Sequence, residues 1–171
     1  VIGNSAYADS HLKNPVNDAT DMSAALSNLG FEVVVRTDAD RKEMYRAIDD
    51  FQSRVFGADA ALFFFAGHGV QVEGENYLVP IGADVQMASD VTSESVPASR
   101  VLARMEESGS RTNIVILDAC RSNPFRGLYR DQTRGLAPMQ DMGGSFIAYQ
   151  PVEKHAFQPN SIPMAASGNQ S

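Results

Sequence analysis

The apolar positions of the chain fall into helix-spaced stripes and short continuous runs. Residues 14–30 carry Met22, Leu26 and Leu29 at helical spacing and stop at Gly30, which predicts a helix. A second apolar stripe has offsets of four, three and four and predicts another helix: Met44, Ile48, Phe51 and Val55. Residues 97–105 have the same character, so a third helix is expected there.

The continuous runs have the length and β-branched content of buried strands. ALFFFAGHG (61–69) and NIVILDACR (113–121) are apolar throughout most of their length, as in strands buried on both faces of a parallel sheet. Shorter strands are expected at Val1–Ile2, residues 31–37 and residues 145–149. Asp38 and Asp40 follow the strand at 31–37 as candidate helix caps. The segments 70–72 and 77–79 flank turn residues and predict a small hairpin.

Strands alternate with helices along the chain, which predicts one α/β domain over residues 1–171 with three layers and a mostly parallel central sheet. Residues 121–144 and 150–171 have turn residues without periodicity and are expected to be loops. The chain opens inside an apparent strand and closes without an element to cover the last sheet edge. We therefore expect parts of the domain to lie beyond both ends.

The composition narrows the classes of partner. The chain has 171 residues, 43% hydrophobic and 20% charged, with a net charge of −7. This acidic balance, without a dense basic block, disfavours binding to nucleic acid. The longest apolar run, residues 58–67, is interrupted by Asp59 and is too short to cross a bilayer. No nucleic-acid partner and no membrane association are expected within this sequence.

His68 and Cys120 are the candidate catalytic pair. Each lies at the end of a predicted buried strand, and the carboxyl ends of parallel strands form the ligand-binding edge of α/β sheets. A thiol needs a base to become a nucleophile, a leaving amine needs an acid, and one imidazole can serve as both. Alone, the cysteine would more often be a small core residue and the histidine a loop residue, but the pair favours catalysis. A single cysteine also fits a reducing compartment, so a cytoplasmic location is expected.

Three motifs then follow in order: FFAGHG, NYLVP and ILDACR. His68 precedes Cys120 by 52 residues, close to the caspase spacing of about 50. The motifs resemble the large catalytic subunit of prokaryotic caspase homologues and metacaspases (orthocaspases, peptidase family C14), over nearly the whole chain. The resemblance implies a caspase-haemoglobinase fold and a cysteine endopeptidase with a Cys-His dyad. It also implies an oxyanion hole from the backbone N–H groups of Gly69 and Cys120, and a small-subunit segment C-terminal to this chain.

Two acidic residues predict which substrates are cut. Asp118 precedes Cys120 by two positions, where caspases that cut after Asp have Gln, and a carboxylate there attracts Arg or Lys at P1. LKNPVNDA resembles the early metacaspase segment whose Asp contributes to the primary pocket, which maps onto Asp18. Protein or peptide substrates with P1 Arg, then Lys, are expected. The simpler alternatives are a helix first-turn role for Asp18 and a strand-end cap for Asp118.

The segment 121–144 is a candidate processing loop, since exposed loops are preferred sites of proteolysis. Four arginines lie in it, and Arg130 and Arg134 are the leading self-cleavage candidates because they are farther from Cys120 than Arg121. Self-cleavage would fit a zymogen. The alternative is that these arginines only solvate the loop.

Metal binding is not favoured by the sequence. Some metacaspases are activated by calcium, and Asp84 and Asp90 are candidate ligands, but no run resembles an EF-hand loop. His11 and His155 have no partners at the spacing of a zinc site. We expect no required cofactor, with calcium activation as the exception to test.

Two other functions remain open alternatives. A caspase-fold interaction module that does not use its chemistry would be expected to have lost His68 or Cys120. A flavodoxin-like nucleotide or signalling domain would need a glycine-rich phosphate loop after the first strand, where NSAYADSHLKN stands instead.

Overall fold

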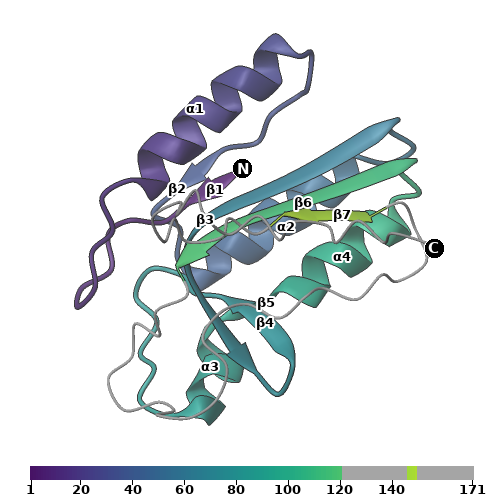
Figure 1. The fold of residues 1–171 in the computed structure, drawn as a ribbon. Helices are drawn as coiled ribbons and strands as arrows, with labels where there is room; N and C mark the ends of the chain where they lie inside the picture. The colour runs from purple at the N-terminus through teal and green to yellow at the C-terminus, as the bar shows by residue number, and fades with distance from the viewer. Residues whose placement is uncertain (121–145, 150–171) are drawn as a thin grey trace, which may run out of the picture.

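The chain forms a mixed sheet with helices on both faces (Figure 1). The computed structural model describes residues 1–120 and 146–149. The parallel strands run in the order β2, β1, β3, β6, β7. Their bounds are β1 (Ile2–Gly3), β2 (Arg36–Thr37), β3 (Ala60–Val72), β6 (Thr112–Cys120) and β7 (Phe146–Tyr149). An antiparallel extension of β3 continues through β4 (Glu75–Leu78) to β5 (Val96–Pro97).

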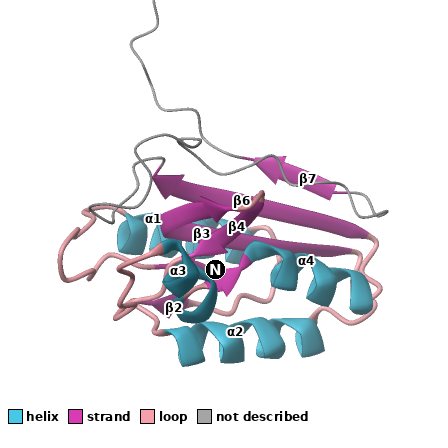
Figure 2. Ribbon diagram, turned by 90° about the horizontal axis from the view of Figure 1, so that it is seen from below, coloured by secondary structure: helices cyan, strands magenta, loops and turns pink. Residues whose placement is uncertain are grey.

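Helices on the two faces complete three layers. The helices are α1 (Pro15–Asn28), α2 (Arg41–Arg54), α3 (Ala88–Glu94) and α4 (Ala98–Glu107). Helix α1 packs on β1 and β3, whereas α2 and α4 run side by side against the opposite face (Figure 2). The predicted α/β fold with a mostly parallel sheet is confirmed, as are the helices expected near residues 14–30, 44–55 and 97–105.

Strand β3 shows why the apolar runs are continuous. Phe63 and Phe65 belong to the core cluster beneath α2 and α4, and Phe64 and Ala66 belong to the cluster beneath α1. Successive side chains of a strand point to opposite faces, so both parities are buried when helices cover both faces. The same alternation places even-numbered positions at the end of β3 on the α1 face, which decides where His68 lies.

The acidic residues before α2 have different roles. Asp40 caps the helix by accepting from the backbone N–H of Glu43 at 2.8 Å, and the Glu43 carboxylate accepts from the N–H of Asp40 in return. Asp38 does not cap the helix as the sequence suggested. Its carboxylate accepts instead from the backbone N–H groups of Ser5 at 2.7 Å and Ala6 at 2.9 Å. Asp38 therefore fixes the loop that follows β1.

Two strand predictions need correction. The strand expected at 31–37 is only Arg36–Thr37, whose ladder partners are Ile2 and Gly3, and residues 31–35 have no ladder partner among the described residues. His68 does not lie past the end of its strand: β3 continues to Val72, since it exchanges a parallel partner for an antiparallel one at that point. Helix α3 and strand β5 were not anticipated. None of the helices in the described ranges combines the length and apolarity that a bilayer crossing demands.

Candidate active site

His68 lies where β3 changes its neighbour. His68 pairs with Cys120 as the last step of the parallel β3–β6 ladder, and Gly69 begins the antiparallel ladder with Leu78 of β4. Figure 1 shows β6 ending where β3 runs on toward β4. Adjacent strands are about 4.8 Å apart, so the backbones of His68 and Cys120 are immediate neighbours. The Cys120 side chain is outside what the structure describes.

A backbone carbonyl orients the imidazole. His68 is 4% exposed, and its Nε2 lies 2.8 Å from the carbonyl oxygen of Ser10. A carbonyl only accepts hydrogen bonds, so in the neutral ring Nε2 carries the proton and donates it to Ser10. Nδ1 is left with a lone pair, and no described residue is hydrogen-bonded to it. This tautomer offers Nδ1 as the base.

The loop that carries Ser10 is tied to the sheet by buried polar groups. The Asn4 side chain donates to the carbonyl of Ala39 at 3.2 Å and accepts from its N–H at 2.9 Å. Two further bonds close the loop on itself and on α1: Leu12 N–H donates to the Ser5 carbonyl, and Val16 N–H donates to the Ser5 hydroxyl. These bonds restrain the loop on both sides of Ser10.

Burial controls the charge of His68. Loss of hydration lowers the pKa of His68 below its ordinary 6.5, and the hydrogen bond to Ser10 opposes this shift in part. A buried histidine with a lowered pKa is neutral at pH 7, which is the form that can accept a proton.

Asp18 and Asp118 both lie on the α1 face of the sheet. Asp118 pairs with Ala66 in the ladder, and Asp18 lies in the first turn of α1. Partial loss of hydration raises the pKa of Asp118, although its side chain keeps solvent contact, and the negative charge of Asp18 raises it further. The two carboxylates repel each other, and a cation between them would remove this repulsion. The structure thus places the two predicted substrate-binding residues on one face of the sheet, where the charge of Asp18 affects the pKa of Asp118.

The predicted oxyanion donors can be placed by backbone direction. His68 C=O accepts from the N–H of Val79 at 2.9 Å, so the backbone groups of His68 face β4. Backbone groups of successive strand residues point to opposite sides, and the N–H of Gly69 is therefore directed toward β6. On that side β3 pairs with β6, and the His68–Cys120 register makes the Gly69 N–H a ladder donor to the Cys120 carbonyl and the Cys120 N–H a donor to the Gly67 carbonyl. The role of these two N–H groups as oxyanion donors stays a prediction.

The candidate calcium ligands have local structural roles. The carboxylate of Asp90 accepts from the N–H groups of Gln86 and Met87 at the start of α3, and Asp84 accepts from the Gln86 side chain. Within residues 1–120 and 146–149, no three His, Cys, Asp or Glu residues gather closely enough to hold a metal ion. His155, Arg130 and Arg134 fall outside the described residues, as does the candidate processing loop 121–144.

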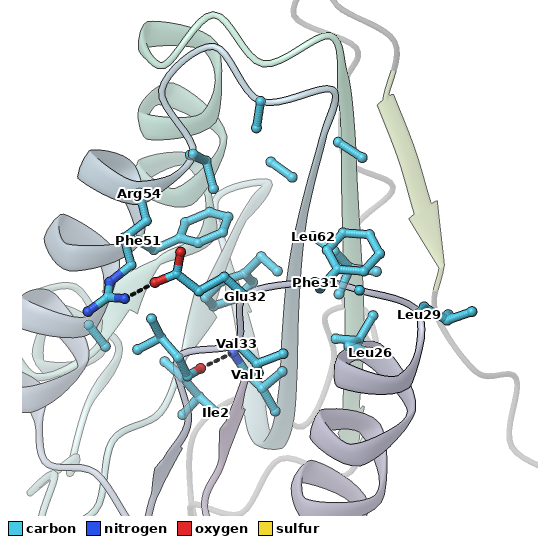
Figure 3. A pocket seen from close by; sticks show the side chains of 18 residues that line it. Val1, Ile2, Leu26, Leu29, Phe31, Glu32, Val33, Phe51, Arg54 and Leu62 are labelled. Atoms are coloured by element: carbon cyan, nitrogen blue, oxygen red, sulfur yellow. Dashed lines mark hydrogen bonds and ion pairs between the residues drawn. The ribbon is translucent and has the colours of Figure 1, made fainter.

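An apolar cavity of about 290 Å³ lies at the opposite end of the strands (Figure 3). Its lining includes Phe31, Phe51 and Leu62, with the Glu32–Arg54 ion pair at its side. The backbone nitrogen of Val1 donates to the Val34 carbonyl at 2.9 Å beside this cavity. His68, Asp18 and Asp118 do not line this cavity, so it is separate from the candidate active site.

Sequence reasoning missed two contributors to the site. Ser10 acts through its backbone carbonyl, which any residue type supplies, so no sequence signal could have revealed it. Tyr7 contacts His68 directly, with ring centroids 4.4 Å apart. The sequence offered one indication of this role, because Tyr7 is an aromatic residue in a loop of otherwise small and polar residues.

Comparison with known proteins identifies the family. The caspase domain model of peptidase family C14 matches residues 1–168. The chain is 30% identical over 122 residues to the human mucosa-associated lymphoid tissue lymphoma translocation protein 1 and, equally, to its mouse homolog. The match covers 71% of this chain but 14% of those proteins, so the chain spans a small part of their length. With the caspase-type arrangement of sheet and helices, these matches show that the chain belongs to the caspase domain family of C14 peptidases.

Proposed function

We propose that this chain is a cysteine endopeptidase that cleaves proteins and peptides after Arg, and less rapidly after Lys, through Cys120 and His68. The observation that carries the proposal is the His68–Cys120 register, together with an imidazole whose Nε2 is held by Ser10 while Nδ1 remains available. Strand alternation assigns position 120 to the same face as His68 and Asp118, which supports their cooperation.

In the acylation step, Nδ1 of His68 takes the thiol proton and the thiolate of Cys120 attacks the carbonyl carbon of the scissile bond. The resulting oxyanion is held by the N–H groups of Gly69 and Cys120, which exchange their hydrogen bonds at the end of the β3–β6 ladder for it. Collapse of this intermediate breaks the C–N bond, and the imidazolium gives its proton to the departing amine. A thioester to Cys120 remains. A water molecule then attacks it, His68 accepts the water proton, and release of the acid restores the thiol.

The preference for basic P1 side chains rests on Asp18 and Asp118. Two carboxylates that repel each other in the free protein form a favourable site for one guanidinium, which can bond both in a planar fork. A lysine ammonium supplies the charge without the fork, so Lys is expected to follow Arg. An acidic P1 side chain would meet two like charges.

Two further parts of the proposal concern regulation. The chemistry requires no metal, since every step uses thiol, imidazole and backbone groups; activity is expected to be unchanged by a calcium chelator. Self-cleavage at Arg130 or Arg134 would separate this large subunit from a C-terminal small subunit, as in a zymogen that matures by its own activity.

The test is a comparison of three fluorogenic peptides that differ only in P1, with Arg, Lys or Asp. Purified protein is expected to release the fluorophore fastest from the Arg peptide and more slowly from the Lys peptide. Faster cleavage after Asp than after Arg would overturn the assigned specificity. Release that is unchanged by Cys120→Ala would overturn the assigned nucleophile.

A further inference from the structure

Tyr7 sits between the catalytic histidine and the hairpin that follows it. Its hydroxyl accepts from the backbone N–H of His68 at 3.1 Å and donates to the carbonyl of Val79 at 2.9 Å. The Val79 N–H donates directly to the His68 carbonyl at 2.9 Å. A regular antiparallel ladder would pair the other two groups directly as well. The Tyr7 hydroxyl therefore replaces one backbone hydrogen bond at the position of His68.

The ring of Tyr7 also contacts the imidazole. The two rings lie with centroids 4.4 Å apart at an interplanar angle of 54°, and the residues are 8% and 4% exposed. One side of the imidazole is thus bounded by Tyr7 while Nε2 is held by the Ser10 carbonyl. Both restraints come from the loop between β1 and α1. Gly67 permits the approach, because a Cβ there would lie 2.7 Å from the Tyr7 hydroxyl oxygen.

We propose that Tyr7 is a positioning residue, which holds the backbone and the ring of His68 in the orientation that directs Nδ1 at Cys120. This inference rests on the proposed function. The hydroxyl fixes the peptide of His68, and the ring restricts rotation of the imidazole. Loss of either lets the imidazole depart from the one geometry in which it can take the thiol proton.

The chain offers a direct readout, because Cys120 is its only cysteine. Iodoacetamide alkylates thiolates, so its rate of reaction against pH reports how strongly His68 promotes ionisation of Cys120. The matched control is Tyr45→Phe, since Tyr45 lies on α2 at the opposite face and keeps its ring contact with Arg100. The elements around His68 carry these ionisable side chains: Tyr7, Asp9, His11 and Lys13 in the loop, Asp18 and Asp21 on α1, Glu75 and Tyr77 on β4, and Asp118 on β6. Apart from Tyr7 itself, all variants retain them.

The wild type is expected to react well below the pH at which His68→Ala reacts, since a thiol without a base ionises near pH 8.5, approximately its ordinary pKa. Tyr7→Phe is expected to react roughly tenfold more slowly than the wild type at pH 7, the effect of one lost hydrogen bond, with a midpoint moved toward that of His68→Ala. Tyr7→Leu, which also lacks the ring, should approach the His68→Ala profile. Tyr45→Phe should retain the wild-type profile.

If Tyr7 had a purely structural role, both Tyr7 variants would melt at a lower temperature but keep the wild-type alkylation profile. This result would overturn the inference. If Tyr7→Leu does not fold, Tyr7→Phe decides, because it keeps the ring. The assay needs no peptide hydrolysis. If the wild type cleaves no peptide but its alkylation profile still differs from that of His68→Ala, the proposed function alone is overturned. Identical alkylation profiles of the wild type and His68→Ala would overturn both the proposed function and the role of Tyr7.

Discussion

Replacing Asp118 by Asn should raise stability and lower activity at the same time. The pKa of Asp118 is raised first by partial loss of hydration and second by the charge of Asp18. A carboxyl whose pKa is raised by folding costs stability as the pH rises from its unfolded pKa, near 3.9, through its folded value. At pH 7 the ionised Asp118 is therefore destabilising, and the neutral amide removes that cost.

The expected magnitudes differ between the two properties. Asp118 keeps solvent contact, so screening limits the gain in stability to less than about 1 kcal/mol, or a rise in Tm of up to about 3 °C for a chain of this size. Loss of one carboxylate from a desolvated ion pair costs about 2–5 kcal/mol. Solvent contact places this pair at or below the lower end, about 2 kcal/mol, so kcat/KM for an Arg peptide should fall by about 10- to 30-fold.

The assay compares peptides that end in Arg and in citrulline, which has nearly the same shape without the charge. Asp118→Asn should reduce the ratio of kcat/KM for Arg over citrulline and leave citrulline cleavage nearly unchanged. Asp21→Asn is the matched control, because it removes the same charge from an exposed position of α1. A wild-type Arg/citrulline ratio in Asp118→Asn, or an equal reduction in Asp21→Asn, would refute the assignment of Asp118 to P1 recognition.

Three further outcomes are expected. The acid limb of kcat/KM should have its midpoint below pH 6.5, because burial lowers the pKa of His68. The free energy of unfolding should fall as the pH drops through that range. A kcat/KM midpoint above pH 6.5 would contradict the assignment of His68 as a buried base. Gly67→Ala should lower the free energy of unfolding in urea by about 1–3 kcal/mol, because its Cβ would meet Tyr7 and Phe65 within 3.0 Å; unchanged stability would refute this packing. Mass spectrometry should find the wild type, but not Cys120→Ala, cut after Arg130 or Arg134; equal intactness after prolonged incubation would eliminate self-processing under those conditions.

The sequence predicted those features of the fold that depend on periodicity and burial. The continuous run at 61–69 predicted a strand buried on both faces, and the stripe from Met44 to Val55 predicted α2. His68 and Cys120 were expected at one edge of a parallel sheet, and the ladder pairs these two residues, although β3 continues past His68. Local patterns sufficed because each element has one buried surface to satisfy.

Features that depend on long-range backbone contacts were not predictable in the same way. The extension of β3 past His68 depends on its pairing with β4, and no pattern within residues 61–69 indicates where one partner replaces another. The Ser10 carbonyl and the Tyr7 hydroxyl reach His68 across 58 and 61 positions of sequence. Asp38 resembled a helix cap by position, yet it bonds a loop 32 or 33 residues away.

The central claim is that Cys120 and His68 act as one catalytic unit. The most direct measurement is the single-turnover cleavage of a fluorogenic Arg peptide by the wild type, Cys120→Ala and His68→Ala, each shown to be folded by circular dichroism. We predict that either substitution lowers the rate by several orders of magnitude, and that the double variant is no worse than the singles because the two residues act together. Retention of more than about 5% of the wild-type rate by Cys120→Ala would contradict the claim, since members of a catalytic unit each cost several orders of magnitude. Equal, negligible rates for all three proteins would favour a caspase-fold interaction module.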